Sequence, residues 1–307
     1  MNRKQYPKQM IRLREKCYDC YMSYEKYARY FLRFLMAFVL FLLIDHRFDY
    51  SGRISGVLFV LLLSLIGAVL PDGVFVFLLL AVSAGKIYFL SPILAIAVLF
   101  ISLVVYVILL QYCDKSILLT ALIPLAMFLK VPALPAIIAG LFFSPTVLLA
   151  ILCGIVVYYM YGSVLNCEAI LAKNSKIDMV KLVQRFMDGI AKNPSIYIWS
   201  ITLSIVCLLV FFVSRMKIAY AFEISIGMAM VINMVFSIVC NILLKGQLSS
   251  VWIVVGSLLA GILGYALQFF HMILDYGKVE ELQFEDDEYY YYVKAVPKLR
   301  VEPKKKA

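Results

Sequence analysis

The 307-residue sequence has little charge and little histidine, and each shortage excludes a class of protein. Charged residues make up 16% of the chain and hydrophobic residues 64%, whereas a soluble domain is about a quarter charged and about half apolar. The two histidines, His46 and His271, are far apart, so we expect no histidine-rich metal site. Walker, HExxH and GxSxG motifs are also missing from the sequence. We therefore expect no enzymatic activity, no metal and no cofactor.

The seven cysteines do not form a disulfide framework, because their number is odd and three of them lie inside apolar segments. Cys17 and Cys20 make a CxxC pair, but no second CxxC or CxxH completes a zinc site. We interpret them as two reduced thiols on one helix.

The sequence is rich in long apolar segments. A helix that crosses a bilayer needs about 20 mostly apolar residues. The apolar runs are 31–44, 54–70, 74–90, 91–112, 117–130, 131–144, 145–165, 196–214, 221–244 and 251–273. The predicted fold is therefore all-α, a polytopic integral membrane protein with about eight to ten transmembrane or half-transmembrane helices. The first run follows a long charged segment, so we expect no cleaved signal peptide.

Composition divides the chain into five parts. They are a basic, tyrosine-rich cytoplasmic helix at 1–33, a first membrane group at 34–165, a loop at 166–195, a second membrane group at 196–273 and a cytoplasmic tail at 274–307. In the loop, Ser175 and Asp178 resemble a capping box, and apolar residues from Met179 to Ile190 then share one helical face. This pattern predicts one amphipathic helix on the membrane surface.

The charged ends predict the topology. Of the 29 basic residues, nine lie in 1–33 and seven in 277–307, an excess that is typical of cytoplasmic flanks and attracts anionic headgroups. We therefore expect the lipid bilayer, and not nucleic acid, to be the partner of this charge. With both ends on one side, the number of crossings is even.

The short runs 117–130 and 131–144 leave that number open. Lys130, Pro132 and Pro135 separate or interrupt them, and Pro124 lies inside the first. They form a re-entrant hairpin, two short tilted spans or one broken helix. Zero or two net crossings here place the loop 166–195 outside, whereas a single crossing would place that loop inside and the tail outside.

Small and polar residues recur at every fourth position in the last two spans. They are Ala221, Ser225, Ala229, Asn233, Ser237 and Asn241, followed by Gly256, Ala260, Gly264 and Gln268. Residues four apart share a helix face, and small residues let helices approach closely in lipid. We favour a packing role for this stripe. The alternative is that its polar members, Ser225, Asn233, Ser237, Asn241 and Gln268, line a path for a substrate or an ion.

Charged residues are nearly absent from the middle of the runs. Lys86 and Lys130 lie at breaks between runs, where a lysine can reach the interface, and Glu223 lies near the cytoplasmic end of its run. None of them is placed as a proton relay would be.

The tail combines acids, tyrosines and lysines. We predict that it docks a cytosolic or membrane protein partner through Glu285, Asp286, Asp287, Glu288, Tyr289, Tyr290, Tyr291 and Tyr292. The tyrosine segment has strong strand propensity and could add as a strand to the partner. The alternative is a solvated tail whose lysines meet anionic lipid.

The segment "EDDEYYYYVKAVPK", 285–298, follows a last span ending in "FFHMILDY". This end of the chain resembles the C-terminal segment of uncharacterised polytopic membrane proteins of Gram-positive anaerobic bacteria. The resemblance implies a bacterial plasma membrane and nothing about a substrate.

The many spans, the proline-broken pair 117–144 and the polar stripe favour a transporter-like or permease-like membrane subunit. The alternative is a non-transporting scaffold or assembly factor that recruits a partner through its cytoplasmic tails.

Overall fold

A computed structural model describes most of the chain. The described residues are 16, 24–48, 56–113, 116–173, 178–216, 218, 220–246, 248–271, 280–285 and 290–295. Most of the predicted N-terminal helix, the Cys17–Cys20 pair and the four residues from Asp286 to Tyr289 lie outside them.

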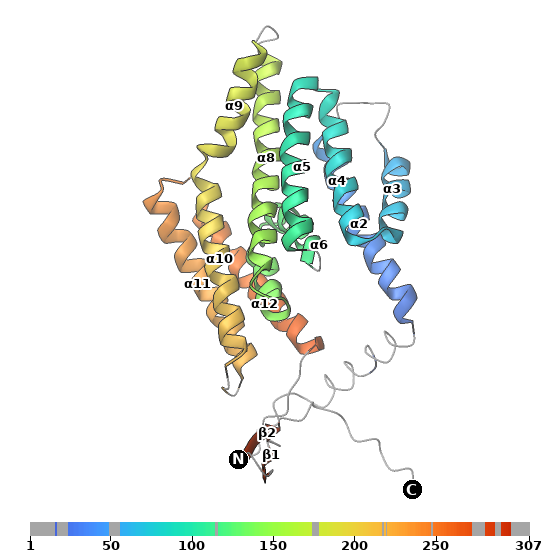
Figure 1. Ribbon diagram of the computed structural model, residues 1–307. Helices are drawn as coiled ribbons and strands as arrows, with labels where there is room; N and C mark the ends of the chain where they lie inside the picture. The colour runs from blue at the N-terminus through green and yellow to red at the C-terminus, as the bar shows by residue number, and fades with distance from the viewer. Residues whose placement is uncertain are drawn as a thin grey trace.

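Helices build the whole described membrane part (Figure 1). They are α2 (Glu25–Arg47), α3 (Val57–Val69), α4 (Asp72–Tyr88), α5 (Pro92–Tyr112), α6 (Ile117–Phe128), α7 (Ala133–Phe142), α8 (Val147–Lys173), α9 (Met179–Ala191), α10 (Pro194–Ser214), α11 (Ala221–Leu243) and α12 (Ser250–His271). Within the described residues, six helical segments are long and apolar enough to cross a membrane: α2, α5, α8, α9 with α10, α11 and α12. The predicted polytopic α-helical membrane fold is thereby confirmed.

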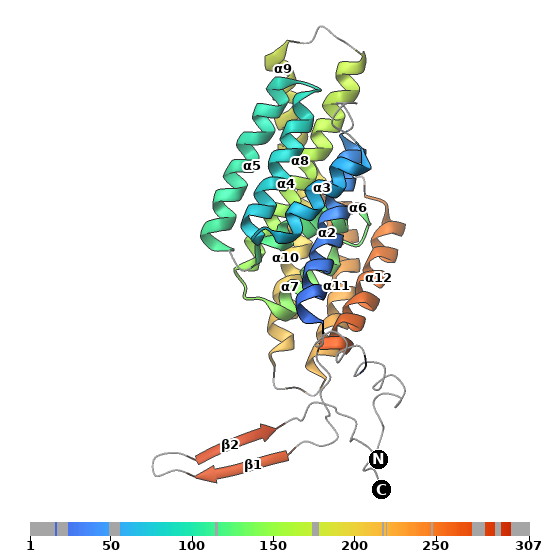
Figure 2. The same cartoon turned by 90° about the vertical axis from the view of Figure 1, so that its right-hand side faces the viewer.

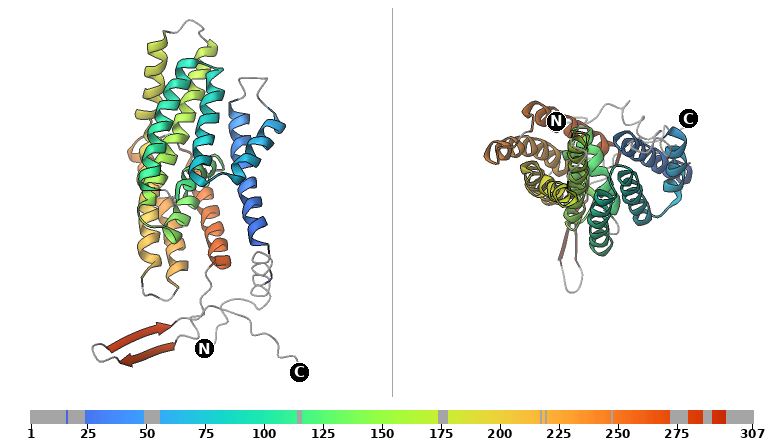
Figure 3. Two further views of the ribbon diagram at one scale, coloured as in Figure 1. Left: turned by 45° about the vertical axis from the view of Figure 1, so that its right-hand side comes forward. Right: turned by 90° about the horizontal axis from the view of Figure 1, so that it is seen from above.

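The helices run up and down between two ends of the bundle. The first turn of α2, the connection from α10 to α11 and the last turn of α12 lie at the lower end in Figures 1 and 2. Figure 3 shows from the side and from above that α2 and α3 stand apart from the group of α8, α10 and α11. The two ends of the described membrane part therefore lie on one side, as an even number of crossings requires.

The segment between α5 and α8 enters the bundle and returns to the same side. The Cys113 thiol, just after α5, donates a hydrogen bond of 3.3 Å to the carbonyl of Thr146, just before α8. Helix α6 ascends beside α8, where the Thr120 hydroxyl donates to the Ala150 carbonyl at 3.3 Å. Helix α7 packs on α10, with Gly140 against the backbone of Cys207. Of the predicted possibilities, the structure shows the re-entrant hairpin with no net crossing.

The break between α6 and α7 has local causes. Lys130 adopts a left-handed backbone conformation with φ of 62°, and Pro132 then precedes the first residue of α7. At its other end, α7 is closed by the Arg215 side chain, which donates to the carbonyls of Gly140 at 3.1 Å and Phe143 at 3.2 Å. A cation at a helix C-terminus satisfies free carbonyls and complements the helix dipole. Arg215 therefore stabilises the C-terminal end of α7, which lies at the surface.

The predicted amphipathic helix is α9, and it packs along the upper part of α8 (Figure 1). Its residues Leu182 and Phe186 are buried, and the Ser163 hydroxyl of α8 donates to the Phe186 carbonyl at 2.7 Å. Helix α8 continues to Lys173, so the loop is shorter than the predicted 166–195. Asn193 separates α9 from α10, because its side chain caps the new helix whose first residue is Pro194.

After α12, the strands β1 (Glu280–Glu285) and β2 (Tyr290–Ala295) form an antiparallel hairpin, visible in Figure 2. In its register Glu285 pairs with Tyr290 and Glu280 with Ala295. The strand propensity of the tyrosine segment is thus realised within the chain itself.

Candidate functional site

The polar residues of the predicted stripe lie in contacts between α11 and its neighbours. Ser225, Ser237 and Gln268 are buried, and the Asn233 amide donates to the Ser257 hydroxyl of α12 at 2.7 Å. The Asn241 side chain donates a hydrogen bond to the Leu248 carbonyl at 2.8 Å and accepts one from the Leu248 N–H at 3.1 Å. It thereby holds the turn between the two helices. These contacts favour the packing interpretation, whereas the path interpretation stays a prediction.

The small residues of α12 do more than pack on α11. The break between α6 and α7 at Lys130 forms an elbow in the chain. A Cβ atom on Gly256 would lie 2.1 Å from the Lys130 carbonyl oxygen, so only a glycine at position 256 leaves room for this elbow. A Cβ on Gly264 would lie 3.3–3.4 Å from methyl groups of Ile226 on α11 and Ile137 on α7. The re-entrant helix α7 therefore lies against the stripe of α12 along with α11.

The tail residues are only partly described. Glu285 ends β1, and Tyr290, Tyr291 and Tyr292 begin β2, opposite Glu285, Phe284 and Gln283. The docking role of the tail is not tested by this pairing and stays a prediction.

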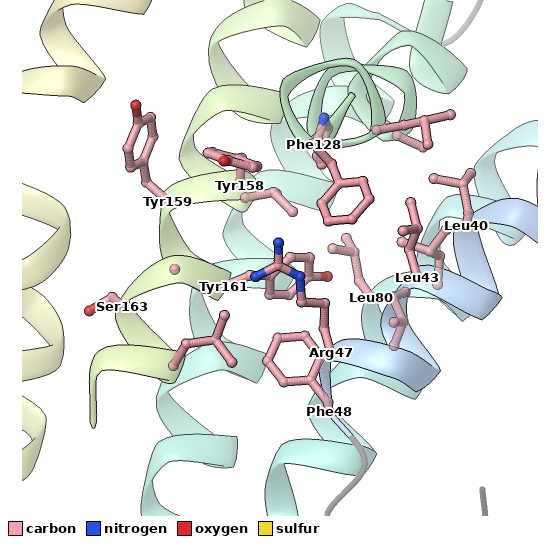
Figure 4. Close-up of a pocket in the computed structure, with 18 of the residues that line it drawn as sticks. Leu40, Leu43, Arg47, Phe48, Leu80, Phe128, Tyr158, Tyr159, Tyr161 and Ser163 are labelled. Atoms are coloured by element: carbon pink, nitrogen blue, oxygen red, sulfur yellow. The ribbon is translucent and has the colours of Figure 1, made fainter. Parts of the chain in front are cut away.

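A cavity lies elsewhere in the bundle. This cavity, of about 380 Å³, is lined by α2, α4, α6 and α8, and Gly189 and Asn193 join its wall near the start of α10 (Figure 4). Sites for small ligands typically measure about 300–1,000 Å³, are mostly apolar and carry a few polar groups. The cavity falls within this description in both size and lining.

Arg47, in the last turn of α2, is the one charged side chain among the described residues that line the cavity. Its guanidinium points into the cavity among the rings of Phe128, Tyr158 and Tyr161, as Figure 4 shows. The guanidinium carbon lies 4.9 Å from the centre of the Phe128 ring, a cation–π contact. None of the ion pairs among the described residues involves Arg47.

Several hydroxyl groups of the wall are already engaged in holding the helices together. Tyr161 donates to the Ser83 hydroxyl of α4 at 2.9 Å, and its ring stands edge-on to that of Phe48 on α2. The Thr120 hydroxyl donates a hydrogen bond to the Ala150 carbonyl of α8, and the Ser163 hydroxyl donates one to the Phe186 carbonyl of α9. The cavity wall is therefore held by cross-helix bonds, while Arg47 contributes a charge that forms no ion pair with a carboxylate of the described residues.

The polarity of the cavity changes along the bundle. On α2, Leu40, Leu43, Ile44 and Arg47 all line it and share one helix face. Leu40 precedes Arg47 by seven residues, or about 10 Å along the helix at 1.5 Å per residue. On α8 the lining likewise proceeds from Val157 at the lower end to Asn166 at the upper end. The cavity therefore has an apolar end and a cationic, polar end.

A buried ion pair adjoins this upper end. Lys86 of α4 pairs with Asp45 of α2, and their side chains are only 5% and 19% exposed. Lys86 lies at a break between apolar runs, where a lysine can reach the interface, but its side chain is instead buried because this carboxylate gives the ammonium group a partner inside the protein. The pair fixes the end of α2 and so the position of Arg47, two residues further along.

Sequence reasoning missed Arg47, Asp45 and the cavity. Asp45 and Arg47 follow the first apolar run directly and resemble an ordinary polar flank. One signal was available in the sequence. Leu40, Leu43, Ile44 and Arg47 follow helical spacing, so Arg47 lies on the same face of α2 as the three apolar residues.

No family model, no curated protein and no solved structure matches the chain.

Proposed function

We propose that the protein is a transporter-like membrane subunit whose substrate chamber is the cavity between α2, α4, α6 and α8. The observation that carries the proposal is Arg47, a cation without a carboxylate partner among the described residues, inside a cavity of about 380 Å³. Arg47 is an exposed residue at the end of a candidate membrane span, and ionisable residues of such spans are rare and mark substrate or ion pathways.

The helix hairpin beside the cavity supports the same proposal. Transport sites in membrane proteins are typically formed where helices are interrupted within the membrane. Here α6 forms one wall of the chamber and stops at the Lys130 elbow. Rearrangement at this elbow would change the wall of the chamber without disturbing the long helices.

Access to the chamber from both sides of the membrane tests the proposal. In a variant without native cysteines, Thr120→Cys places a thiol on the chamber wall. A transporter should expose this thiol to a sulfonate-bearing methanethiosulfonate, which does not cross membranes, in both right-side-out and inside-out vesicles. Thr202→Cys is the matched control, because Thr202 is fully buried on α10 and does not line the chamber. Reaction of Thr120→Cys from one side only would contradict transport.

The β1–β2 hairpin favours a second function, that of a scaffold which recruits a partner. Two strands alone are marginally stable, and their outer edges offer unpaired backbone groups to a further strand. Replacing Tyr290, Tyr291 and Tyr292 with serine keeps every charge of the tail. The variant should insert normally and lose its co-purifying proteins. An unchanged set of co-purifying proteins would rule out docking through these tyrosines.

A further inference from the structure

We propose that the cavity binds a lipid-type amphiphile, with its anionic head at Arg47 and its apolar chain along α2 and α4. This inference deepens the proposed function, because it names the substrate class of the same chamber. It follows from the charge, the shape and the opening of the cavity, taken in turn.

The charge of the cavity selects an anion. Arg47 is the one ionisable group of formal charge among its described lining residues, and no carboxylate in the described part of the chain forms an ion pair with it. A guanidinium group offers five N–H donors in a planar fork that fits carboxylate and phosphate groups. A neutral or cationic ligand would offer this exposed guanidinium no counter-charge, whereas an anion would pair with it. The head of the ligand is therefore a carboxylate or a phosphate group.

The shape of the cavity selects an apolar chain behind that head. On α2 and α4 the wall below Arg47 is apolar and includes Leu40 and Leu43 from α2 and Val76, Leu79 and Leu80 from α4. These residues offer no hydrogen-bonding side chain, so they match hydrocarbon and not a second polar group. At the upper end, Asn166 and Asn193 lie in the same wall and can accommodate the polar neighbours of the head.

The position of the opening identifies the bilayer as the source. Helix α2 packs mainly on α3, and α6 packs mainly on α8, so the cavity separates these two pairs. Arg47 and Phe128 both line the cavity and are both exposed, Phe128 by 36%, so the cavity opens beside them. Because α6 stops within the membrane part, this exposed part of the wall lies at the depth of the bilayer. A ligand dissolved in the bilayer can enter there without first crossing the aqueous phase.

Photolabelling of the full chain in phosphatidylcholine vesicles tests the assignment. The probe is palmitate that carries a diazirine on its chain, and the matched probe is the corresponding alcohol, which lacks the charge. We expect palmitate to label peptides of α2, α4, α6 or α8 that line the cavity, and the alcohol to label them far less. Unlabelled oleate should compete, whereas inorganic phosphate and oleyl alcohol should not.

Variants decide whether Arg47 holds the head. Arg47→Gln should reduce palmitate labelling by about tenfold, since a hydrogen bond to a charged group is lost, and Arg47→Lys should retain part of it. Arg185→Gln is the matched control, because Arg185 is exposed on α9 and does not line the cavity. Ala121→Leu, which fills the cavity from α6 and keeps Arg47, should also reduce labelling and serves if Arg47→Gln does not fold.

Each outcome bears on a different part of the proposal. Equal labelling by acid and alcohol, or full labelling of both Arg47→Gln and Ala121→Leu, would overturn it. Competition by inorganic phosphate would show a site for water-soluble anions and overturn the bilayer source. If palmitate does not bind but Thr120→Cys reacts from both sides, the ligand class is wrong and the transport chamber stands. If palmitate binds but Thr120→Cys reacts from one side only, the site holds lipid without transport.

Discussion

Asp45 and Lys86 join the end of α2 to the end of α4 through an ion pair that is almost completely withdrawn from the surface. The contact joins residues 41 positions apart and lies next to the cavity that contains Arg47. Helix α2 otherwise packs mainly on α3, and this pair is one of two described ion pairs that join it to α4, the other being Arg33 with Asp72.

Removing one partner of this pair should destabilise the protein strongly. Asp45→Asn leaves the Lys86 ammonium buried without a counter-charge, which typically costs about 3–5 kcal/mol. The double variant Asp45→Leu with Lys86→Met should recover much of the loss. The measurement is the thermal unfolding midpoint of the purified protein. Asp188→Asn is the control, because its pair with Lys192 is exposed and should contribute less than about 1 kcal/mol. Equal midpoints for Asp45→Asn and Asp188→Asn would contradict a buried pair.

Thiol labelling should place the two ends of the bundle on opposite sides of the membrane. The native Cys167 is buried and does not line the cavity, so engineered cysteines in a cysteine-free variant are needed. Val180→Cys, on the 79% exposed Val180 of α9, should react in intact cells. Met216→Cys, in the connection between α10 and α11, should react only after the membrane is permeabilised, because the basic flanks favour a cytoplasmic lower end. The reverse pattern would invert the orientation.

Gly256→Ala should destabilise the protein because the new methyl group would collide with the Lys130 carbonyl. Overpacking of this kind typically costs about 1–3 kcal/mol. Gly85→Ala is the matched control, since nothing lies within 4 Å of a Cβ atom at Gly85. There the change should be neutral or stabilising by about 0.5–1 kcal/mol, because alanine is the better helix former. Similar unfolding midpoints for the two variants would mean that α12 does not hold the elbow.

A double-mutant cycle should detect the bond between α11 and α12. Asn233→Ala and Ser257→Ala each remove one partner of the 2.7 Å hydrogen bond, and such bonds in membranes contribute about 0.6 kcal/mol on average. The double variant should lose less than the sum of the single losses. Asn233→Leu should lose more than Asn233→Ala, because its larger apolar side chain does not fit the close contact. Strict additivity in the cycle would argue that the bond does not form.

The spans were predictable from the sequence because each one is recognised from a run of consecutive apolar residues, without knowledge of its neighbours in space. A run such as 91–112 must be helical in lipid, since no water is present to satisfy its backbone. Helix α5, at Pro92–Tyr112, agrees with that run nearly residue for residue. The amphipathic helix α9 was predictable for the same reason, from the spacing of Met179, Leu182 and Phe186.

The candidate site was not predictable in the same way, because it depends on which helices meet. In the sequence, Arg47 belongs to what resembles an ordinary polar flank. Only the fold brings Phe128 and Tyr161, from two later helices, close to it. Likewise, Lys86 looked like an interfacial lysine until Asp45 was found beside it. Pairings between distant segments leave no periodic trace in a single sequence.

The enclosure of α7 has a consequence for how the chain is made. Every residue from Ala133 to Leu141 except Leu134 and Ile138 is buried, and the covering helices α10, α11 and α12 all follow α7 in the sequence. During synthesis α7 emerges before Arg215 exists to close its last turn and before Gly256 exists to receive the elbow. The re-entrant hairpin therefore reaches its final place only after the last helices have been inserted. The order in which the helices are synthesised thus differs from the order in which they pack together.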